Sequence, residues 1–148
     1  PAKLTFCGNG GSAADCQHIV GGFVIKLLKL RKALPVISLT SNNSVITAIS
    51  NDMDFNTIFT QQLEGIANPR DILIGISTSG ISHNVVSAFE YAKQNDLYTV
   101  LVTGGSSNKL LSIADTNIKV LSQNTQSIQE VYLMIFHILC KRLDEVYE

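Results

Sequence analysis

Asp71-Ile-Leu-Ile-Gly-Ile-Ser-Thr-Ser-Gly-Ile-Ser82 is the stretch that decides the fold. A nearly continuous apolar run gives way here to a cluster of serine, threonine and glycine. Such a run is typical of a strand buried on both faces, which is the strand of a parallel sheet. The polar cluster predicts a strand-to-helix turn. In open parallel sheets, ligands bind beyond the carboxyl ends of the strands, at turns of this kind.

Similar apolar runs recur along the chain, separated by longer segments of helical period. The predicted strands are Leu4 to Cys7, Val36 to Thr40, Asp71 to Ser77, Thr99 to Thr103 and Asn117 to Leu121. The predicted helices lie at about 12–30, 43–50, 54–66, 83–95, 106–113 and 126–146. Strands that alternate with helices, without hairpin signals, indicate right-handed βαβ crossovers. We therefore expect an α/β three-layer sandwich, a five-stranded parallel sheet flanked by helices in the flavodoxin-like or Rossmann-like manner.

Composition limits the functions that this fold could carry. The 148 residues are about one domain's worth, and the net charge is −1 with 16% charged residues. The 11 lysines and arginines form no basic stripe, which argues against direct nucleic-acid binding. No apolar run reaches the ~20 residues of a membrane span. The three cysteines lack metal-ligand spacing, which favours buried thiols in a reduced cytoplasmic compartment. The low charged fraction indicates subunit contacts.

Two turns of the predicted sheet are rich in glycine and serine. The first strand runs into Gly8-Asn-Gly-Gly-Ser12, and the third runs into Ser77, Thr78, Ser79 and Ser82. Four hydroxyls just before a helix could bind a phosphate together with the free N–H groups of the helix, without lysine or arginine. Ordinary N-capping is the alternative, although one serine would be enough for a cap. The first turn is not a dinucleotide fingerprint, because the sixth position is Ala13 instead of glycine.

A few polar residues elsewhere fit a site but do not define one. His18 lies about two turns into the first helix. Gln129 and His137 are eight residues apart on the last helix, about 80° round its axis, so both can border one cleft. Glu130 would point elsewhere, and capping would explain Asn51-Asp52. Taken singly, none of these residues indicates a function.

Four motifs together give the sequence a specific resemblance. They are Gly-Asn-Gly-Gly-Ser-Ala-Ala-Asp-Cys-Gln-His (8–18), Leu-Thr-Ser-Asn-Asn-Ser-Val-Ile-Thr-Ala-Ile-Ser-Asn-Asp (39–52), Ile-Gly-Ile-Ser-Thr-Ser-Gly (74–80) and Ile-Gln-Glu-Val-Tyr-Leu-Met-Ile-Phe-His-Ile-Leu-Cys (128–140). The chain resembles the phosphoheptose isomerases of the sugar isomerase (SIS) domain superfamily. The resemblance implies a single SIS domain over residues 1–148, without the N-terminal helical region of the family.

The resemblance also implies an activity and a site. The expected protein is a cytoplasmic homotetramer that converts sedoheptulose 7-phosphate to D-glycero-D-manno-heptose 7-phosphate through an enediol, for ADP-heptose and lipopolysaccharide precursor synthesis. His18 and His137 are the expected catalytic residues, and His18, Gln129 and His137 the expected ligands of a possible zinc ion. The implied substrate-binding residues are Asn9, Gly10, Gly11, Ser12, Asn51, Asp52, Ser77, Thr78, Ser79, Ser82 and Gln129.

The sequence departs from the family at the residue expected to move the proton. The family carries a glutamate four residues after the first-helix histidine, as catalytic base and zinc ligand, but this chain has Gly22, preceded by Gly21. Each glycine weakens a helix by about 1 kcal/mol relative to alanine. Without the carboxylate we expect zinc to bind weakly or not at all, and His137, or Glu64 of a neighbouring subunit, to serve as the base. Ile81 also replaces an asparagine that is usual in the family.

Two other functions remain open at this point. The chain could be a non-catalytic sugar-phosphate-binding SIS protein or a replication-initiator-associating adaptor, because the bacterial adaptor shares the fold and also lacks the glutamate. That adaptor tends to lose the last-helix histidine too, whereas His137 is retained here. A fragment of a glutamine-dependent aminosugar synthase would need a second SIS repeat and an amidotransferase domain, and neither is present in this sequence. The isomerase is therefore the favoured interpretation.

Overall fold

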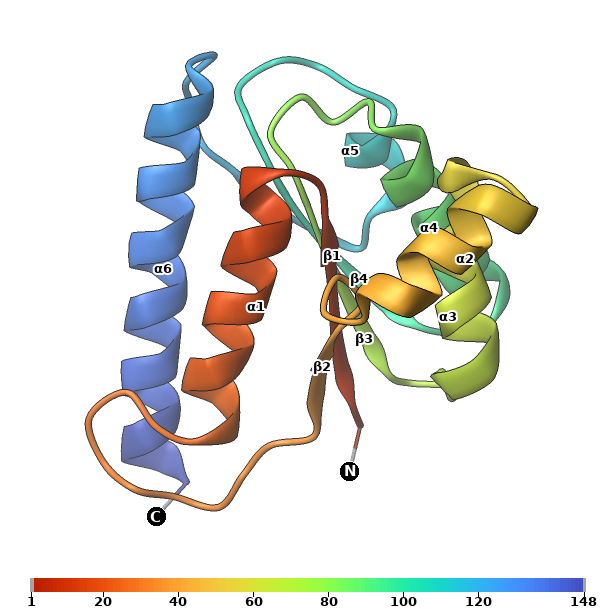
Figure 1. The fold of residues 1–148 in the computed structure, drawn as a ribbon. Coiled ribbons are helices and arrows are strands. Elements are labelled where there is room, and N and C mark those ends of the chain that lie inside the picture. Colours follow the sequence, from red (N-terminus) through yellow and green to blue (C-terminus); the bar gives the residue numbers. More distant parts are fainter. Residues whose placement is uncertain (1, 148) are drawn as a thin grey trace.

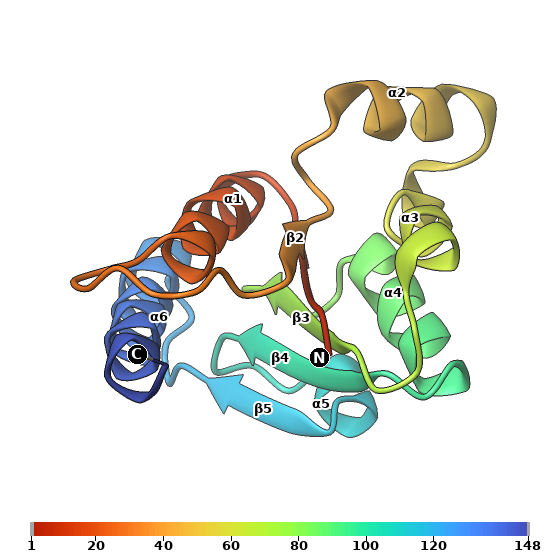
Figure 2. The ribbon, with the colours of Figure 1, turned by 90° about the horizontal axis from the view of Figure 1, so that it is seen from below.

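A computed structural model describes residues 2–147, and its centre is one five-stranded parallel sheet (Figures 1 and 2). The strand order is β2-β1-β3-β4-β5, and every neighbouring pair is parallel. The strands are β1 (Leu4–Gly8), β2 (Val36–Ser38), β3 (Ile72–Ser77), β4 (Tyr98–Thr103) and β5 (Thr116–Lys119). The predicted α/β fold with a five-stranded parallel sheet is confirmed.

Helices cover both faces of the sheet, which makes three layers (Figure 2). One face carries α1 and α6, and the other carries α3, α4, α5 and a short 3-10 helix η1, while α2 lies at the periphery of that second side. The helices are α1 (Gly11–Val24), α2 (Asn43–Asp52), η1 (Phe55–Thr57), α3 (Thr60–Ile66), α4 (His83–Gln94), α5 (Leu110–Ile113) and α6 (Thr125–Val146). None of these described helices has the combined length and apolarity needed to cross a bilayer.

Two apolar cores fill the spaces between the layers. Because side chains alternate along a strand, Phe6 faces α1 and α6, while its neighbour Cys7 faces the other layer. The ring of Phe6 packs edge-to-face on Phe23 of α1 and Phe136 of α6, each at 5.7 Å between ring centroids. All three cysteines are free and buried, as the sequence predicts. The first core fixes α1 against α6, and this contact positions half of the candidate site.

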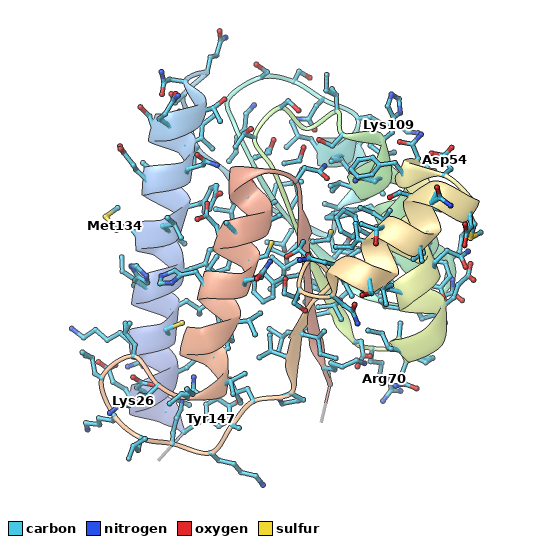
Figure 3. The ribbon with its side chains drawn as sticks, viewed as in Figure 1. Lys26, Asp54, Arg70, Lys109, Met134 and Tyr147 are labelled. Atoms are coloured by element: carbon cyan, nitrogen blue, oxygen red, sulfur yellow. The ribbon has the colours of Figure 1, made fainter. Side chains whose placement is uncertain are left out.

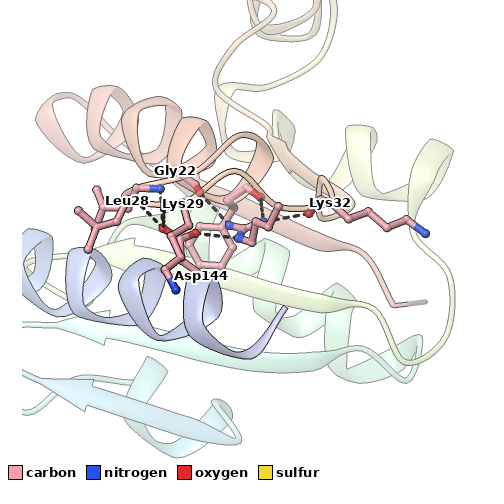
Figure 4. A network of polar contacts seen from close by, with 8 residues as sticks. Gly22, Leu28, Lys29, Lys32 and Asp144 are labelled. Atoms are coloured by element: carbon pink, nitrogen blue, oxygen red, sulfur yellow. Dashed lines mark hydrogen bonds and ion pairs between the residues drawn. The ribbon is translucent and has the colours of Figure 1, made fainter. Parts of the chain in front are cut away.

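The first helix is shorter than predicted, because it ends at Val24 instead of residue 30. The guanidinium of Arg31 donates to the carbonyls of Gly22 and Phe23, both at 2.9 Å, and so binds the free end of α1. Asp144 of α6 accepts from Arg31 Nε at 3.0 Å and from the backbone N–H groups of three consecutive residues, Leu27, Leu28 and Lys29 (Figure 4). These hydrogen bonds, first that of Leu28, lower the pKa of Asp144 to about 2. The segment after α1 is therefore anchored to α6.

Other predicted elements shift for local reasons. The predicted helix 54–66 is interrupted, because Asp54 caps the short helix η1 through Asn56 N and a new helix, α3, begins at Thr60. The predicted helix 106–113 is reduced to the four residues of α5. The second and fifth strands end at Ser38 and Lys119, two residues earlier than predicted in each case. None of these differences changes the order of the layers.

The register of the sheet brings the two glycine- and serine-rich turns to one edge. Gly8 at the end of β1 lies opposite Ile76 in β3, and Ser77 at the end of β3 lies opposite Thr103 in β4. The turns that follow β1 and β3 therefore leave the sheet side by side, and the Gly104–Gly105 loop follows β4 at the same edge. This is the edge at which open α/β sheets bind ligands.

Candidate functional site

The serine turn, residues 77–82, is organised by its own hydroxyls. Ser77 Oγ is nearly buried, accepts from Gly80 N at 3.1 Å and lies 3.3 Å from Ser82 Oγ. Ser79 Oγ accepts from Ile81 N at 3.4 Å. A serine oxygen that accepts from the backbone keeps its own hydrogen to donate. The turn can therefore offer hydroxyl donors to an anion while its fold is held by its own N–H groups.

Gly80 is required by the shape of this turn. Its φ is 70°, in the left-handed region that favours glycine, and a Cβ there would come within 2.1 Å of the Asn108 side chain. The carbonyl of Thr78 accepts from Gly104 N at 3.1 Å, which ties the turn to the loop after β4.

Ordinary capping does not account for the serines. Ser82 occupies the N-cap position of α4, but its side chain makes no capping hydrogen bond. In the same chain, Asn42 and Asn124 do cap their helices, accepting from Val45 N and Ser127 N. The N–H groups of His83 and Asn84, the first two of α4, therefore stay open to a ligand, as at the anion-binding ends of other helices.

The glycine turn, residues 8–12, brings the backbone of α1 to the same edge. A Cβ on Gly8 would lie 3.0 Å from the carbonyl oxygen of Ile76, so the neighbouring strand leaves little room for a side chain there. Gly10 has a φ of 56° and stands at the N-cap without a side-chain cap. The N–H groups of Gly11 and Ser12, in the first turn of α1, are free of intrahelical partners.

A pair of asparagines holds the two turns together. Asn9 Nδ2 donates to Asn84 Oδ1, and Asn84 Nδ2 donates back to Asn9 Oδ1, both at 2.8 Å. Asn84 is buried in the first turn of α4 and also accepts from Val85 N. Sequence reasoning missed Asn84, whose only signal was an amide among the buried positions of an apolar helix face. The side chain of Asn9, a predicted substrate-binding residue, is engaged in this tie.

Three pairs of facing residues lie along the contact between α1 and α6, which we call the seam, and they include the remaining predicted residues. At the first step along the seam, the amide of Gln129 lies over Gly11, where a Cβ would lie 2.5 Å from Nε2. At the second step His18 Nε2 lies 3.2 Å from His137 Nε2, with the rings edge-to-face. At the third step Gly22 faces Cys140. Both helices begin at the binding edge of the sheet, so this register places the histidine pair about two turns below the glycine turn.

A cavity of about 240 Å³ opens beside the histidine pair. Its lining includes His18, His137, Gly22, Lys26 and Cys140. A Cβ added to Gly22 would lie 3.0 Å from Cys140 Sγ, so the thiol partly fills the room that a side chain at position 22 would need. Burial raises the pKa of the Cys140 thiol, which is the behaviour of a packing residue more than of a nucleophile.

A zinc ion fits this arrangement only in part. Two nitrogens bound to one tetrahedral zinc are separated by about 3.3–3.4 Å, close to the 3.2 Å between the imidazoles of His18 and His137. Catalytic zinc requires a third protein ligand. Among residues 2–147, no group of three or more histidine, cysteine, aspartate or glutamate side chains could hold a metal, and Gln129 lies at Gly11. The donor set is therefore incomplete for zinc.

Asn51 and Asp52 do not join the two turns within the chain. Both are exposed at the end of α2, where Asn51 Nδ2 donates to Asp52 Oδ1 at 2.7 Å, and Figure 1 shows this end of α2 on the side away from α1 and α6. The opposite end of α2 faces the glycine turn across a cavity of about 380 Å³, whose lining includes Asn43 and Gln17. Glu64, on α3, lies on the other face of the sheet from His137.

A buried hydroxyl network lies behind the glycine turn, and sequence reasoning missed it. Tyr132 OH donates to Asp15 Oδ2 at 2.5 Å and lies 3.2 Å from Ser12 Oγ. Burial, and then the hydrogen bond to Asp15, raise the pKa of Tyr132. The phenol therefore keeps its proton. The spacing of three residues between Ser12 and Asp15 is the only signal that the sequence held, and it does not reveal Tyr132.

Known proteins resemble this chain both in sequence and in fold. The model of the SIS domain family matches residues 2–104. The chain is 46% identical to a phosphoheptose isomerase of Nitratiruptor sp., over 98% of this chain and 78% of that protein, and 44% identical to one of Maridesulfovibrio salexigens, over 97% and 70%. A solved phosphoheptose isomerase structure from Francisella tularensis superposes with a TM-score of 0.92 at 36% identity, covering 97% of this chain and 77% of that one. The chain belongs to the SIS domain family and, within it, to the phosphoheptose isomerases.

Proposed function

We propose that this protein is a cytoplasmic sugar-phosphate isomerase that interconverts sedoheptulose 7-phosphate and D-glycero-D-manno-heptose 7-phosphate, a step towards ADP-heptose and lipopolysaccharide precursors. One observation carries the proposal: the two turns are tied together at one edge of the sheet, with Gln129 and the histidine pair beside them. Relatives that are 44–46% identical to the chain over the aligned residues bear the name phosphoheptose isomerase.

The serine turn binds the phosphate. Hydroxyls of Ser77, Thr78, Ser79 and Ser82, with the first N–H groups of α4, act as donors towards an anion. The positive end of the α4 dipole adds to this attraction. No lysine or arginine is needed, in keeping with the scattered basic residues of the chain.

The histidine pair moves the proton. An aldose–ketose shift through an enediol needs one group to take a proton from carbon and another to serve the oxygens. In a hydrogen-bonded pair of imidazoles one nitrogen donates and the other accepts, so His18 and His137 offer an acid and a base together. Gly22 contributes no group to this step. The reaction as proposed uses no metal.

The empty position at Gly22 favours a second candidate, a sugar-phosphate-binding protein without turnover. Such a protein would use the same two turns and would leave the cavity beside the histidines unused. The adaptor that associates with the replication initiator belongs to this class. Retention of His137 opposite His18 supports the isomerase over this alternative.

The two candidates are separated by incubating the purified protein with sedoheptulose 7-phosphate, with and without zinc. We expect the aldose product to form and the substrate to raise the Tm. A raised Tm without product would overturn the isomerase and keep the binding function. Product formed only with added zinc would overturn the metal-free step. A pull-down with the replication initiator tests the adaptor.

Restoring the carboxylate is the sharper experiment. Position 22 is one helical turn after His18, so Gly22→Glu would place a carboxylate in the cavity beside the histidines. Because its Cβ would lie 3.0 Å from Cys140 Sγ, we pair it with Cys140→Ala to make room. The double variant should gain at least ten-fold in kcat, with Cys140→Ala alone as the matched control. Equal rates in both proteins would show that the position is not part of the chemistry.

The proposed enzyme is a homo-oligomer, up to a tetramer, and α6 supplies one of its interfaces. Met134 and Ile138 are exposed and lie on one face of α6 between Glu130 and Lys141, and Figure 3 shows Met134 directed away from the molecule. An antiparallel α6 of a second copy would place Lys141 of each copy beside Glu130 of the other, as a two-fold axis requires.

Charge reversal tests this interface. Lys141→Glu should dissociate the assembly in sedimentation runs, and adding Glu130→Lys should restore it by exchanging the two charges. Both residues are exposed, so the fold should persist in each variant. A monomeric parent protein, or an assembly indifferent to Lys141→Glu, would overturn the proposed pairing.

A further inference from the structure

In the buried network behind the glycine turn, only one assignment of hydrogen-bond donors and acceptors is possible. Asp15 lies on the half-buried side of α1, and as a carboxylate it can only accept. The phenol of Tyr132 has one hydrogen, and the 2.5 Å contact with Asp15 Oδ2 uses it. Towards Ser12 the oxygen of Tyr132 can therefore only accept. Ser12 must give its own hydrogen to Tyr132 across the 3.2 Å contact.

This assignment leaves Ser12 with lone pairs and no hydrogen to give. Ser12 is 5% exposed, in the first turn of α1, next to the glycines of the turn. Whatever group of a ligand meets Ser12 Oγ must itself donate. A sugar hydroxyl can do this, whereas a phosphate oxygen bearing negative charge cannot.

We propose that Asp15 and Tyr132 are positioning residues that fix Ser12 as a hydrogen-bond acceptor, which makes the glycine turn selective for a hydroxyl of the sugar over its phosphate. The proposal rests on the proposed function and adds the orientation of the ligand. The serine turn has the opposite polarity, because the oxygens of Ser77 and Ser79 accept from backbone N–H groups and their hydrogens remain to be donated. The phosphate belongs at the serine turn and the polyol at Ser12.

Two variants remove this assignment of donors and acceptors in different ways. Tyr132→Phe takes away the acceptor of the Ser12 hydrogen. Asp15→Asn keeps the shape of the side chain but lets its amide donate to Tyr132, so that the phenol can turn its hydrogen towards Ser12. In both variants Ser12 loses its fixed role as an acceptor.

Dissociation constants for sedoheptulose 7-phosphate and for inorganic phosphate, measured separately, provide the test. We expect each variant to bind the sugar phosphate about three- to ten-fold more weakly, the value of one neutral hydrogen bond, and inorganic phosphate as the parent does. A merely structural link between α1 and α6 would weaken both ligands alike or neither, and either result overturns the proposal. Asp15→Asn preserves the volume of the side chain, so it remains informative if Tyr132→Phe folds poorly.

A double-mutant cycle with Ser12→Ala locates the effect. If Asp15 and Tyr132 act through Ser12, Tyr132→Phe should hardly change the affinity for the sugar phosphate once the hydroxyl of Ser12 is absent. The same three- to ten-fold loss in the Ser12→Ala background would overturn the proposal. The readout is binding, so a protein that shows the expected selectivity but forms no product would refute the isomerase and leave this inference standing.

Discussion

The serine turn and the seam between α1 and α6 differ in the proposed role of each and in how far apart in the sequence their residues lie. The serine turn is built from six consecutive residues, and its hydroxyls and glycine are held by its own backbone. The seam is built from residues more than a hundred positions apart, and its histidine pair and its Gly22–Cys140 contact exist only because two helices pack in one register. The proposed binding of an anion therefore depends on local structure, whereas the proposed proton transfer depends on tertiary structure.

This difference explains how one function could change while the other stays. A change of residue at position 22 should leave the turn at 77–82 unaltered, because none of the hydrogen bonds found for the turn involves Gly22 or Cys140. The reverse is also true, since nothing in the serine turn holds His18 against His137. A protein with this arrangement could keep its affinity for a sugar phosphate while its rate of turnover rises or falls.

Ser77→Ala should have the largest effect, and it breaks the binding side of the comparison. The substitution removes a proposed donor to the phosphate from a nearly buried position, and it removes one of the two acceptors of Gly80 N, which keeps the backbone carbonyl of residue 77. Hydrogen bonds to charged groups are worth about 1.5–3 kcal/mol, so affinity for the sugar phosphate should fall about 10- to 100-fold.

Ser87→Ala is the matched control, because the Ser87 hydroxyl donates to the carbonyl of His83 on the same helix and lies outside the serine turn. Titration calorimetry measures both proteins. Equal affinities in the two variants would mean that the phosphate is bound elsewhere.

Asp144→Asn should have the next largest effect, and it acts on the seam. The pKa of Asp144 is lowered to about 2, so its carboxylate stabilises the folded protein above the ordinary aspartate pKa of about 3.9. That contribution is lost as the pH falls from about 4 through 2. At pH 7 the variant should have a lower Tm than the parent, and the difference should shrink as the pH falls towards 2.

Glu145→Gln is the control for this change, since Glu145 is exposed on the next position of α6. Thermal unfolding from pH 2 to pH 7 gives the comparison. A difference in Tm that is the same at both ends of the range would contradict a role for the charge of Asp144.

The sequence predicts most of what is local and little of what is tertiary. The sheet and both turns follow from apolar runs and glycine–serine clusters, because each signal lies within a few neighbouring residues. The end of α1 at Val24 could not be predicted, since it depends on Arg31 and on Asp144 at the far end of the chain. Asn84 and Tyr132 were missed for the same reason, because their partners Asn9 and Asp15 are 75 and 117 positions away. Asn51 and Asp52 lie away from the two turns because of the direction in which α2 runs, and the motif at residues 39–52 does not reveal that direction.

The smallest expected effects come from the two adjacent glycines of α1, and they sharpen the comparison at the seam. Gly21 has open space around it, so Gly21→Ala should stabilise the protein by up to about 1 kcal/mol through helix propensity alone. Gly22→Ala should gain less, because its Cβ would lie 3.0 Å from Cys140 Sγ and the thiol would have to shift by a few tenths of an ångström. Chemical denaturation measures both free energies of unfolding.

The pair becomes decisive in a Cys140→Ala background, where room exists at position 22. There Gly22→Ala should recover the full gain of Gly21→Ala, and the size of the recovery measures how far the thiol has taken over the space beside the histidines. Equal gains in the parent background would instead show that Cys140 yields freely. In that case a carboxylate could be restored at position 22 without any second change, and Gly22→Glu alone would test whether the seam still supports turnover.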